Sequence, residues 1–167
     1  AAAEHYGPVY IRLGRLAVES VNNNDDYHFE LGKGITLRDG KDITIIATGL
    51  MVGEAVKAAK ALEAAAQLEK EGVSAAVVNM HTIKPIDKDI ALKINETCKA
   101  IVTVEQHSVI GGLGSAVAEV LAGRSGAKFA RVGIEDRFGQ SGTPAELFAD
   151  YGLTAENIAE NARRLVK

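Results

Sequence analysis

The sequence is poor in cysteine, tryptophan, proline and aromatic residues. It contains one cysteine, Cys98, no tryptophan, three prolines and only 5% aromatic residues. A single cysteine excludes an internal disulfide and fits a reducing cytoplasm, where we expect the chain to reside. No apolar run approaches the roughly 20 residues that a membrane-spanning helix needs, so we expect no membrane partner.

An excess of charge of one sign is also lacking. The chain of 167 residues has 19 basic and 22 acidic residues, a formal net charge of −3, and no basic run. Nucleic-acid binding needs a positive surface, so we expect no nucleic-acid partner. The four histidines, His5, His28, His81 and His107, have no metal-ligand spacing, and we expect no metal site.

Strand and helix patterns alternate along most of the chain. Strand signals at 34–37 and 43–47 flank an Asp39-Gly40 turn, and this arrangement predicts a hairpin. Further strands are predicted at 73–78, 101–104 and 129–132, and helices at 52–68 (ending at Gly72) and after Asp87, Gly114, Thr143 and Thr154. The alternation predicts an α/β fold, a three-layer α/β/α sandwich with about five strands, four of them parallel and one antiparallel.

The first 33 residues do not belong to this alternation. Residues 7–13 have the pattern of a short strand, but nothing before them could complete a domain. We therefore predict that residues 1–15 hold the terminal strand of a preceding domain, 16–33 a linker and 34–167 the folded domain. From this start we also predict that the chain is a fragment of a longer subunit.

The stretch 101–121 organises the rest: a buried strand, a glycine-rich turn and a helix. Gly111, Gly112 and Gly114 could form a phosphate cradle at the start of a helix. However, Val117 stands where the third glycine of a dinucleotide motif would be, and no acidic residue ends the next strand. Tight packing of the helix against the sheet is the simpler interpretation. The three glycines are also candidates for contacts with a neighbouring domain or subunit.

Polar residues gather where the predicted parallel strands end. His81, Glu105, His107 and Asp136 all follow strands, and ligands of open α/β sheets bind at that edge. A Glu105–His107 pair beside a helix N-terminus could do acid–base chemistry. The alternative is that both residues contact another domain or subunit. We favour this alternative and predict no catalytic residue in the chain.

Five motifs in order resemble one enzyme family. They are GPVYIRLGR at 7–15, ATG at 47–49, NMHTIKPID at 79–87, TVEQHSVIGGLGS at 103–115 and RVGIEDRFG at 131–139. Together they resemble the C-terminal region of transketolase, above all the C-terminal subunit of split transketolases. The resemblance extends to 1-deoxyxylulose-5-phosphate synthase and to the beta subunit of the first component of 2-oxo acid dehydrogenases.

The resemblance implies a two-carbon ketol transfer between sugar phosphates, as in the pentose phosphate pathway, with thiamine diphosphate and Mg²⁺ as cofactors. It also implies a pyrimidine-binding domain before the linker and a homodimer. The cofactor motifs of the family are absent, so we expect no cofactor to be bound by this chain alone. The resemblance assigns a role to one residue of this chain: Arg15 matches an arginine that contacts the substrate phosphate in the family. We interpret Arg12 as a solvated charge.

The sequence thus predicts the C-terminal domain of a transketolase, which packs against other domains, supports a dimer and is inactive alone. Two alternatives remain open. One is a protein-docking domain of the 2-oxo acid dehydrogenase type. The other is a free-standing nucleotide-binding domain that uses residues 111–114.

Overall fold

The computed structural model describes residues 1–15, 17–22, 27–69 and 73–167. Its elements are β1 (Ile35–Arg38), β2 (Ile43–Ala47), α1 (Met51–Glu69), β3 (Ala75–Asn79), α2 (Lys88–Thr97), β4 (Ala100–Ser108), α3 (Leu113–Leu121), β5 (Lys128–Ile134), α4 (Pro144–Asp150) and α5 (Ala155–Val166). The sheet order is β1-β3-β2-β4-β5. Strands β3, β2, β4 and β5 run parallel and β1 is antiparallel to β3, which confirms the predicted fold class.

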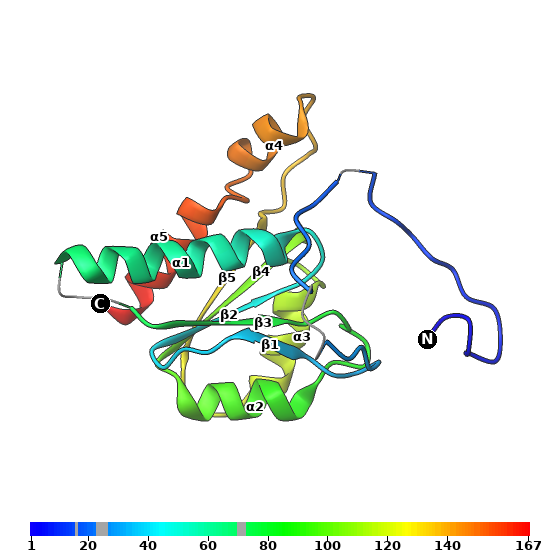
Figure 1. The fold of residues 1–167 in the computed structure, drawn as a ribbon, viewed down its shortest axis with the longest axis horizontal. Coiled ribbons are helices and arrows are strands. Elements are labelled where there is room, and N and C mark those ends of the chain that lie inside the picture. Colours follow the sequence, from blue (N-terminus) through cyan, green and yellow to red (C-terminus); the bar gives the residue numbers. More distant parts are fainter. Residues whose placement is uncertain (16, 23–26, 70–72) are drawn as a thin grey trace.

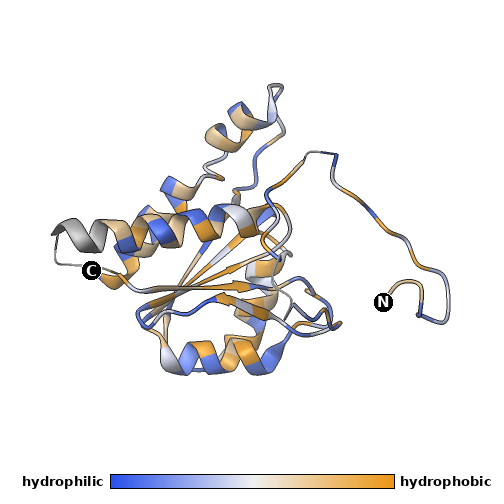
Figure 2. Ribbon diagram, in the orientation of Figure 1, coloured by the Kyte–Doolittle hydropathy of each residue, from blue (hydrophilic) through white to orange (hydrophobic). Residues whose placement is uncertain are grey.

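Two helical layers cover the sheet (Figure 1): α1 and α5 lie on one face, α2 and α3 on the other, and α4 projects beyond the sheet. Side chains alternate along each buried strand, so Val102 and Val104 join the core under α1 and α5 while Ile101 joins the core under α2 and α3. The helices turn their apolar faces inward (Figure 2). Val, Ile, Leu and Ala supply most of the buried apolar side chains.

Local signals placed three helix starts correctly. Asp87 accepts a hydrogen bond from the Ile90 amide, and Thr154 accepts one from the Asn157 amide. Thr143 forms a capping box with Glu146, with Pro144 at the first helical position. These side chains satisfy amides that the first helical turn leaves without partners. The predicted end of α1 at Gly72 lies outside the described residues.

The predicted hairpin is wrong. Strand β1 pairs with β3, and β3 lies between β1 and β2. The Asp39-Gly40 turn therefore spans two strand spacings, about 10 Å, instead of one. It crosses so close to the start of β3 that a Cβ atom on Gly40 would overlap the backbone of Ala75 and Ala76.

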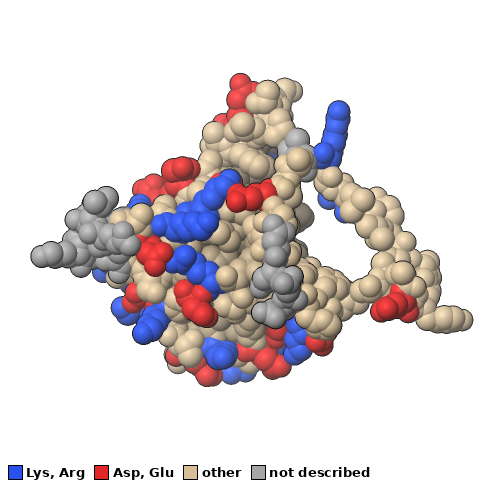
Figure 3. All heavy atoms as spheres, viewed as in Figure 1, with Lys and Arg blue, Asp and Glu red and all other residues tan. Residues whose placement is uncertain are grey.

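Most of the arm formed by residues 1–15 stands away from the domain (Figures 1 and 3). It contains no strand, and its apolar side chains are exposed, with Tyr10 at 89% and Leu13 at 83%. A strand pattern without a partner strand cannot form a sheet. The assignment of this arm to a preceding domain stays a prediction.

The amino-terminal edge of the sheet is held by Asp42. Its carboxylate accepts hydrogen bonds from the Ser74 amide, at 3.0 Å, and from the Lys99 ammonium, at 2.7 Å. Its own amide donates to the Ser74 carbonyl, at 2.9 Å. Asp42 thus ties the crossing loop to the starts of β3 and β4. The Lys99 hydrogen bond, and then the Ser74 amide, lower the pKa of Asp42 from its usual 3.8.

We predict that Asp42→Asn lowers the free energy of unfolding at neutral pH by about 1 to 2 kcal/mol, because charge-assisted hydrogen bonds are lost. A lowered folded-state pKa stabilises the fold above the unfolded value and stops doing so as the pH falls through the folded value. Urea unfolding should therefore show a gap between the two proteins at pH 7 that closes below pH 3.8. Exposed Asp39 offers the control: an equal loss in Asp39→Asn would contradict the assignment.

Candidate functional site

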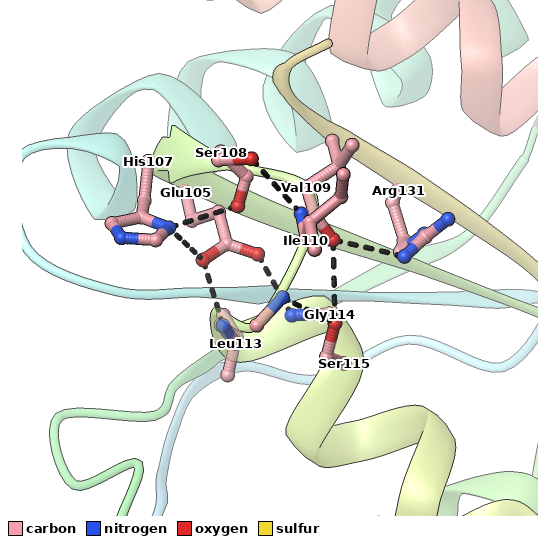
Figure 4. A network of polar contacts seen from close by, with 10 residues as sticks. Glu105, His107, Ser108, Val109, Ile110, Leu113, Gly114, Ser115 and Arg131 are labelled. Carbon is pink, nitrogen blue, oxygen red and sulfur yellow. Dashed lines mark hydrogen bonds and ion pairs between the residues drawn. The ribbon is translucent and has the colours of Figure 1, made fainter. Parts of the chain in front are cut away.

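The stretch from β4 into α3 forms a polar network at the carboxyl edge of the sheet (Figure 4). Strand alternation turns Thr103 and Glu105 to the face that α3 covers, as it does Ile101. The Glu105 side chain therefore lies beneath the first turn of α3. This is the place where the sequence predicted either an anion cradle or tight packing.

The carboxylate of Glu105 occupies the N-terminus of α3. One oxygen accepts a hydrogen bond from the Leu113 amide at 2.7 Å, and the other accepts one from the Gly114 amide at 2.8 Å. The residue is only 2% exposed. A carboxylate at this position satisfies two amides and interacts favourably with the positive end of the helix. Glu105 thus stands where a bound phosphate would stand in a nucleotide-binding domain.

Two of the three glycines lie where a side chain would clash with its neighbours. A Cβ atom on Gly112 would overlap Glu105 Oε2, and one on Gly114 would come within 2.7 Å of Arg131 Cδ and 2.8 Å of Thr103 Oγ1. The tight-packing interpretation is therefore correct for Gly112 and Gly114. Gly111 differs: the space beside it is open, but its φ of +76° favours glycine.

Two predictions are corrected here. Both carboxylate oxygens of Glu105 are used inside the domain, so Glu105 is not available for the interface contact that we predicted. The nucleotide-binding alternative also fails at residues 111–114, because the amides that would hold a phosphate already hold Glu105. The Cβ position of Gly112 is filled by that carboxylate, which leaves no open cradle for a ligand.

His107 lies beside Glu105 without forming an acid–base pair. Its Nδ1 is 4.0 Å from Glu105 Oε2, beyond the range of a hydrogen bond. The same nitrogen donates to the Ser108 carbonyl at 2.9 Å. The His107 side chain is 62% exposed, and the neighbouring Ile110 is 61% exposed. The exposed surface of Gln106, His107 and Ile110 therefore remains a candidate contact with another domain or subunit.

Two residues of the network were not predicted from the sequence. Arg131, from β5, donates from its guanidinium to the Val109 carbonyl at 2.9 Å. The Ser115 hydroxyl contacts the same carbonyl at 3.3 Å and accepts from the Gly111 amide at 2.9 Å. Together these bonds hold the turn between β4 and α3. The position of Ser115 on the first turn of α3 was the available signal, whereas that of Arg131 depends on the pairing of β4 with β5.

The remaining candidates lie outside the network. Arg15 is exposed on the arm, and Asp136 is exposed after β5. Arg12, by contrast, lines a cavity of about 400 Å³ between the arm and the sheet edge, together with His107 and Thr48. Within the described ranges no three His, Cys, Asp or Glu side chains are placed to hold a metal ion. None of the described helices is both long and apolar enough to cross a membrane.

The comparison with known proteins agrees with this architecture. Residues 32–158 match the transketolase C-terminal domain family. Over 167 residues the chain is 47% identical to a Methanocaldococcus jannaschii protein named as a transketolase C-terminal section, covering 99% of this chain and 50% of the relative. It is 43% identical to the 6-deoxy-6-sulfo-D-fructose transketolase subunit of Clostridium sp. (strain MSTE9), covering 98% of this chain and 48% of that subunit.

Solved structures give the same result. A split gene transketolase, described as an inactive beta4 tetramer, superposes with a TM-score of 0.85 at 47% identity, covering 99% of this chain and 52% of that one. The Pichia stipitis transketolase in complex with sedoheptulose 7-phosphate superposes with a TM-score of 0.58 at 29% identity, covering 81% of this chain and 18% of that one. The chain belongs to the transketolase C-terminal domain family. It spans about half the length of the curated relatives it matches.

We predict that Gly112→Ala lowers the free energy of unfolding by about 2 to 4 kcal/mol, because its methyl group displaces Glu105 from α3. Gly111→Ala is the matched control in the same turn: it meets no neighbour and should cost only about 1 kcal/mol of backbone strain. Urea unfolding of both variants tests this ranking. A Gly112→Ala protein as stable as Gly111→Ala would show that the carboxylate can move away at little cost.

Proposed function

We propose that this chain is the C-terminal part of a thiamine-diphosphate-dependent transketolase that transfers a two-carbon ketol unit between sugar phosphates. The observation that carries the proposal is the match over 99% of the chain to a split gene transketolase, at 47% identity. The role of this part is to pack against the other domains or subunit and to support assembly.

We infer that this chain does not hold the cofactor by itself. No three side chains of the metal-binding types converge in the described ranges. The helix N-terminus behind the glycine-rich turn is filled by Glu105. Thiamine diphosphate and its Mg²⁺ would therefore be held by other parts of the enzyme, and this chain would do no chemistry alone.

Exposed apolar side chains support the assembly role. Val9, Tyr10, Ile11 and Leu13 on the arm, and Ile110 beside His107, are large apolar residues in contact with solvent. Such side chains are typical of surfaces that another domain covers. We infer that residues 1–15 complete a neighbouring pyrimidine-binding domain and that Arg15 then contacts the substrate phosphate there. A guanidinium suits that role because its fork of donors matches phosphate oxygens.

A second candidate function is a protein-docking domain of the 2-oxo acid dehydrogenase type. The exposed surface of Gln106, His107 and Ile110 would serve it equally well. The curated relatives favour transketolase, since they include an apulose-4-phosphate transketolase subunit of Phocaeicola vulgatus at 42% identity. Retention of this chain on an immobilised acyltransferase core would favour the docking function instead.

Ketol transfer with thiamine diphosphate and Mg²⁺ tests the proposal. We expect no activity from the 167-residue chain alone and activity once it is combined with the remaining transketolase domains. In that assembled enzyme Arg15→Ala should raise the KM for a sugar phosphate about tenfold or more, because a bidentate phosphate contact is lost. Arg12→Ala serves as the control and should leave the KM within about twofold.

Two outcomes contradict the proposal. Transfer by the isolated chain at the rate of the assembled enzyme would show that it holds a complete active site. An assembled enzyme without any ketol transfer would show that the chain serves another reaction. A third outcome, equal KM changes in the two arginine variants, would contradict only the role assigned to Arg15 and not the proposed function.

A further inference from the structure

A groove runs between α2 and α3, the two helices that cover the same face of the sheet (Figure 1). Its volume is about 640 Å³, within the range of small-molecule sites. Its walls are the loop before α2, one side of each helix, and Arg124 beyond the end of α3. Arg15 and the exposed surface of Gln106, His107 and Ile110 do not line it. The α2–α3 groove is therefore separate from the residues assigned to the transketolase function.

The floor of the α2–α3 groove is apolar. Ile83 and Ile86, from the loop before α2, are half-buried and pack against the core under α2 and α3. Leu92 on α2 and Val120 on α3 are also half-buried, but they belong to neither hydrophobic core and line the groove instead. A ligand with an apolar part would remove these side chains from water, which favours binding.

Three cations stand around this floor. Lys84, Lys88 and Arg124 line the groove, and the side chain of none of them has an ion pair or hydrogen bond with another described residue. Glu119 is the one carboxylate among the described residues that line the groove. The groove thus carries an excess of positive charge, in a chain whose net charge is −3. Such a local excess attracts anions.

Lys88 stands at an unfavourable place for a cation. It is the first residue of α2, and positive charge is repelled by the N-terminal end of a helix. The carboxylate of Asp87 is engaged elsewhere, since it accepts hydrogen bonds from two backbone amides at 2.9 and 3.2 Å. Asp89 pairs with Lys33 at 3.7 Å. Helix stability therefore does not explain Lys88, whereas a bound anion would offset its charge and that of the helix end.

We propose that the α2–α3 groove binds a small amphipathic anion, a phosphate or carboxylate group joined to a short apolar chain. The apolar chain covers Leu92 and Val120, and the anionic group is held by the cations of the groove. The ligand is a free compound rather than a lipid bilayer, because an anionic bilayer would repel a chain of net charge −3. Binding here is independent of ketol transfer, so either test can fail without the other.

Calorimetric titration of the 167-residue chain with octyl phosphate tests the proposal. We expect a Kd of roughly 1 mM, an ordinary value for a ligand of this size. Octanol lacks the anionic group and inorganic phosphate lacks the apolar chain, so each should bind at least about tenfold more weakly. Higher ionic strength should weaken the binding of octyl phosphate, because the three cations are exposed.

Two double variants locate the site. Lys88→Gln with Arg124→Gln should weaken the binding of octyl phosphate by about tenfold. Lys93→Gln with Lys128→Gln is the matched control: it removes the same charge from two exposed lysines that do not line the groove, and it should leave the Kd within about twofold. All four side chains are exposed, so both variants should melt with the native chain.

Any of four results would overturn the proposal. One is no binding of octyl phosphate by a chain that melts normally. Another is equal weakening by the two double variants, which would show attraction to the overall charge and not to this groove. Tighter binding of a hexaglutamate peptide than of octyl phosphate would assign the groove to a protein partner. Sedimentation of the chain with vesicles that contain phosphatidic acid would assign it to a membrane surface.

Discussion

The carboxylate of Glu105 at the N-terminus of α3 is the interaction on which this end of the domain depends. It satisfies two helix amides from within the chain and balances the positive end of the helix. It also explains the sequence around it. A glycine is needed at position 112 because the carboxylate occupies the space of a side chain. The hydrogen bonds of Ser115 and Arg131 to the Val109 carbonyl hold the turn between β4 and α3.

This internal anion changes what the sheet edge can do. In open α/β sheets the edge beside a glycine-rich turn is a ready site for phosphate groups, and here that site is filled by the protein itself. The domain therefore offers nearby surfaces rather than a cofactor cradle. One such surface is the exposed group of Gln106, His107 and Ile110. An exposed surface of this kind agrees with the proposed assembly role.

Much of the fold could be predicted because its signals are local. The side chains of Asp87, Thr143 and Thr154 mark helix starts through bonds to amides three residues away, and the alternation of apolar strands with amphipathic helices defines the three layers. The hairpin prediction was wrong because the Asp39-Gly40 pair indicates a turn but does not indicate which strand pairs with β1. The insertion of β3 between β1 and β2 is set by contacts far apart in sequence, such as those of Asp42 with Ser74 and Lys99.

The site shows the same division. Glycines close to a helix start were visible in the sequence, and so was a glutamate at the end of a buried strand. That the glutamate points to the α3 face follows from counting alternation from Ile101, a signal that was present in the sequence. The buried atoms His81 Nδ1 and Asn22 Oδ1, which have no hydrogen-bond partner among the described residues, could not be found this way, because their burial is set by the tertiary fold.

The most direct test of the central claim, that Glu105 permanently fills the phosphate position of α3, is a titration followed by NMR at the amide signals of Leu113 and Gly114. With ATP, NAD or inorganic phosphate added in excess, the account predicts that both signals stay where they are. A saturable shift of these two signals would contradict it, because it would show that a ligand phosphate can replace the carboxylate.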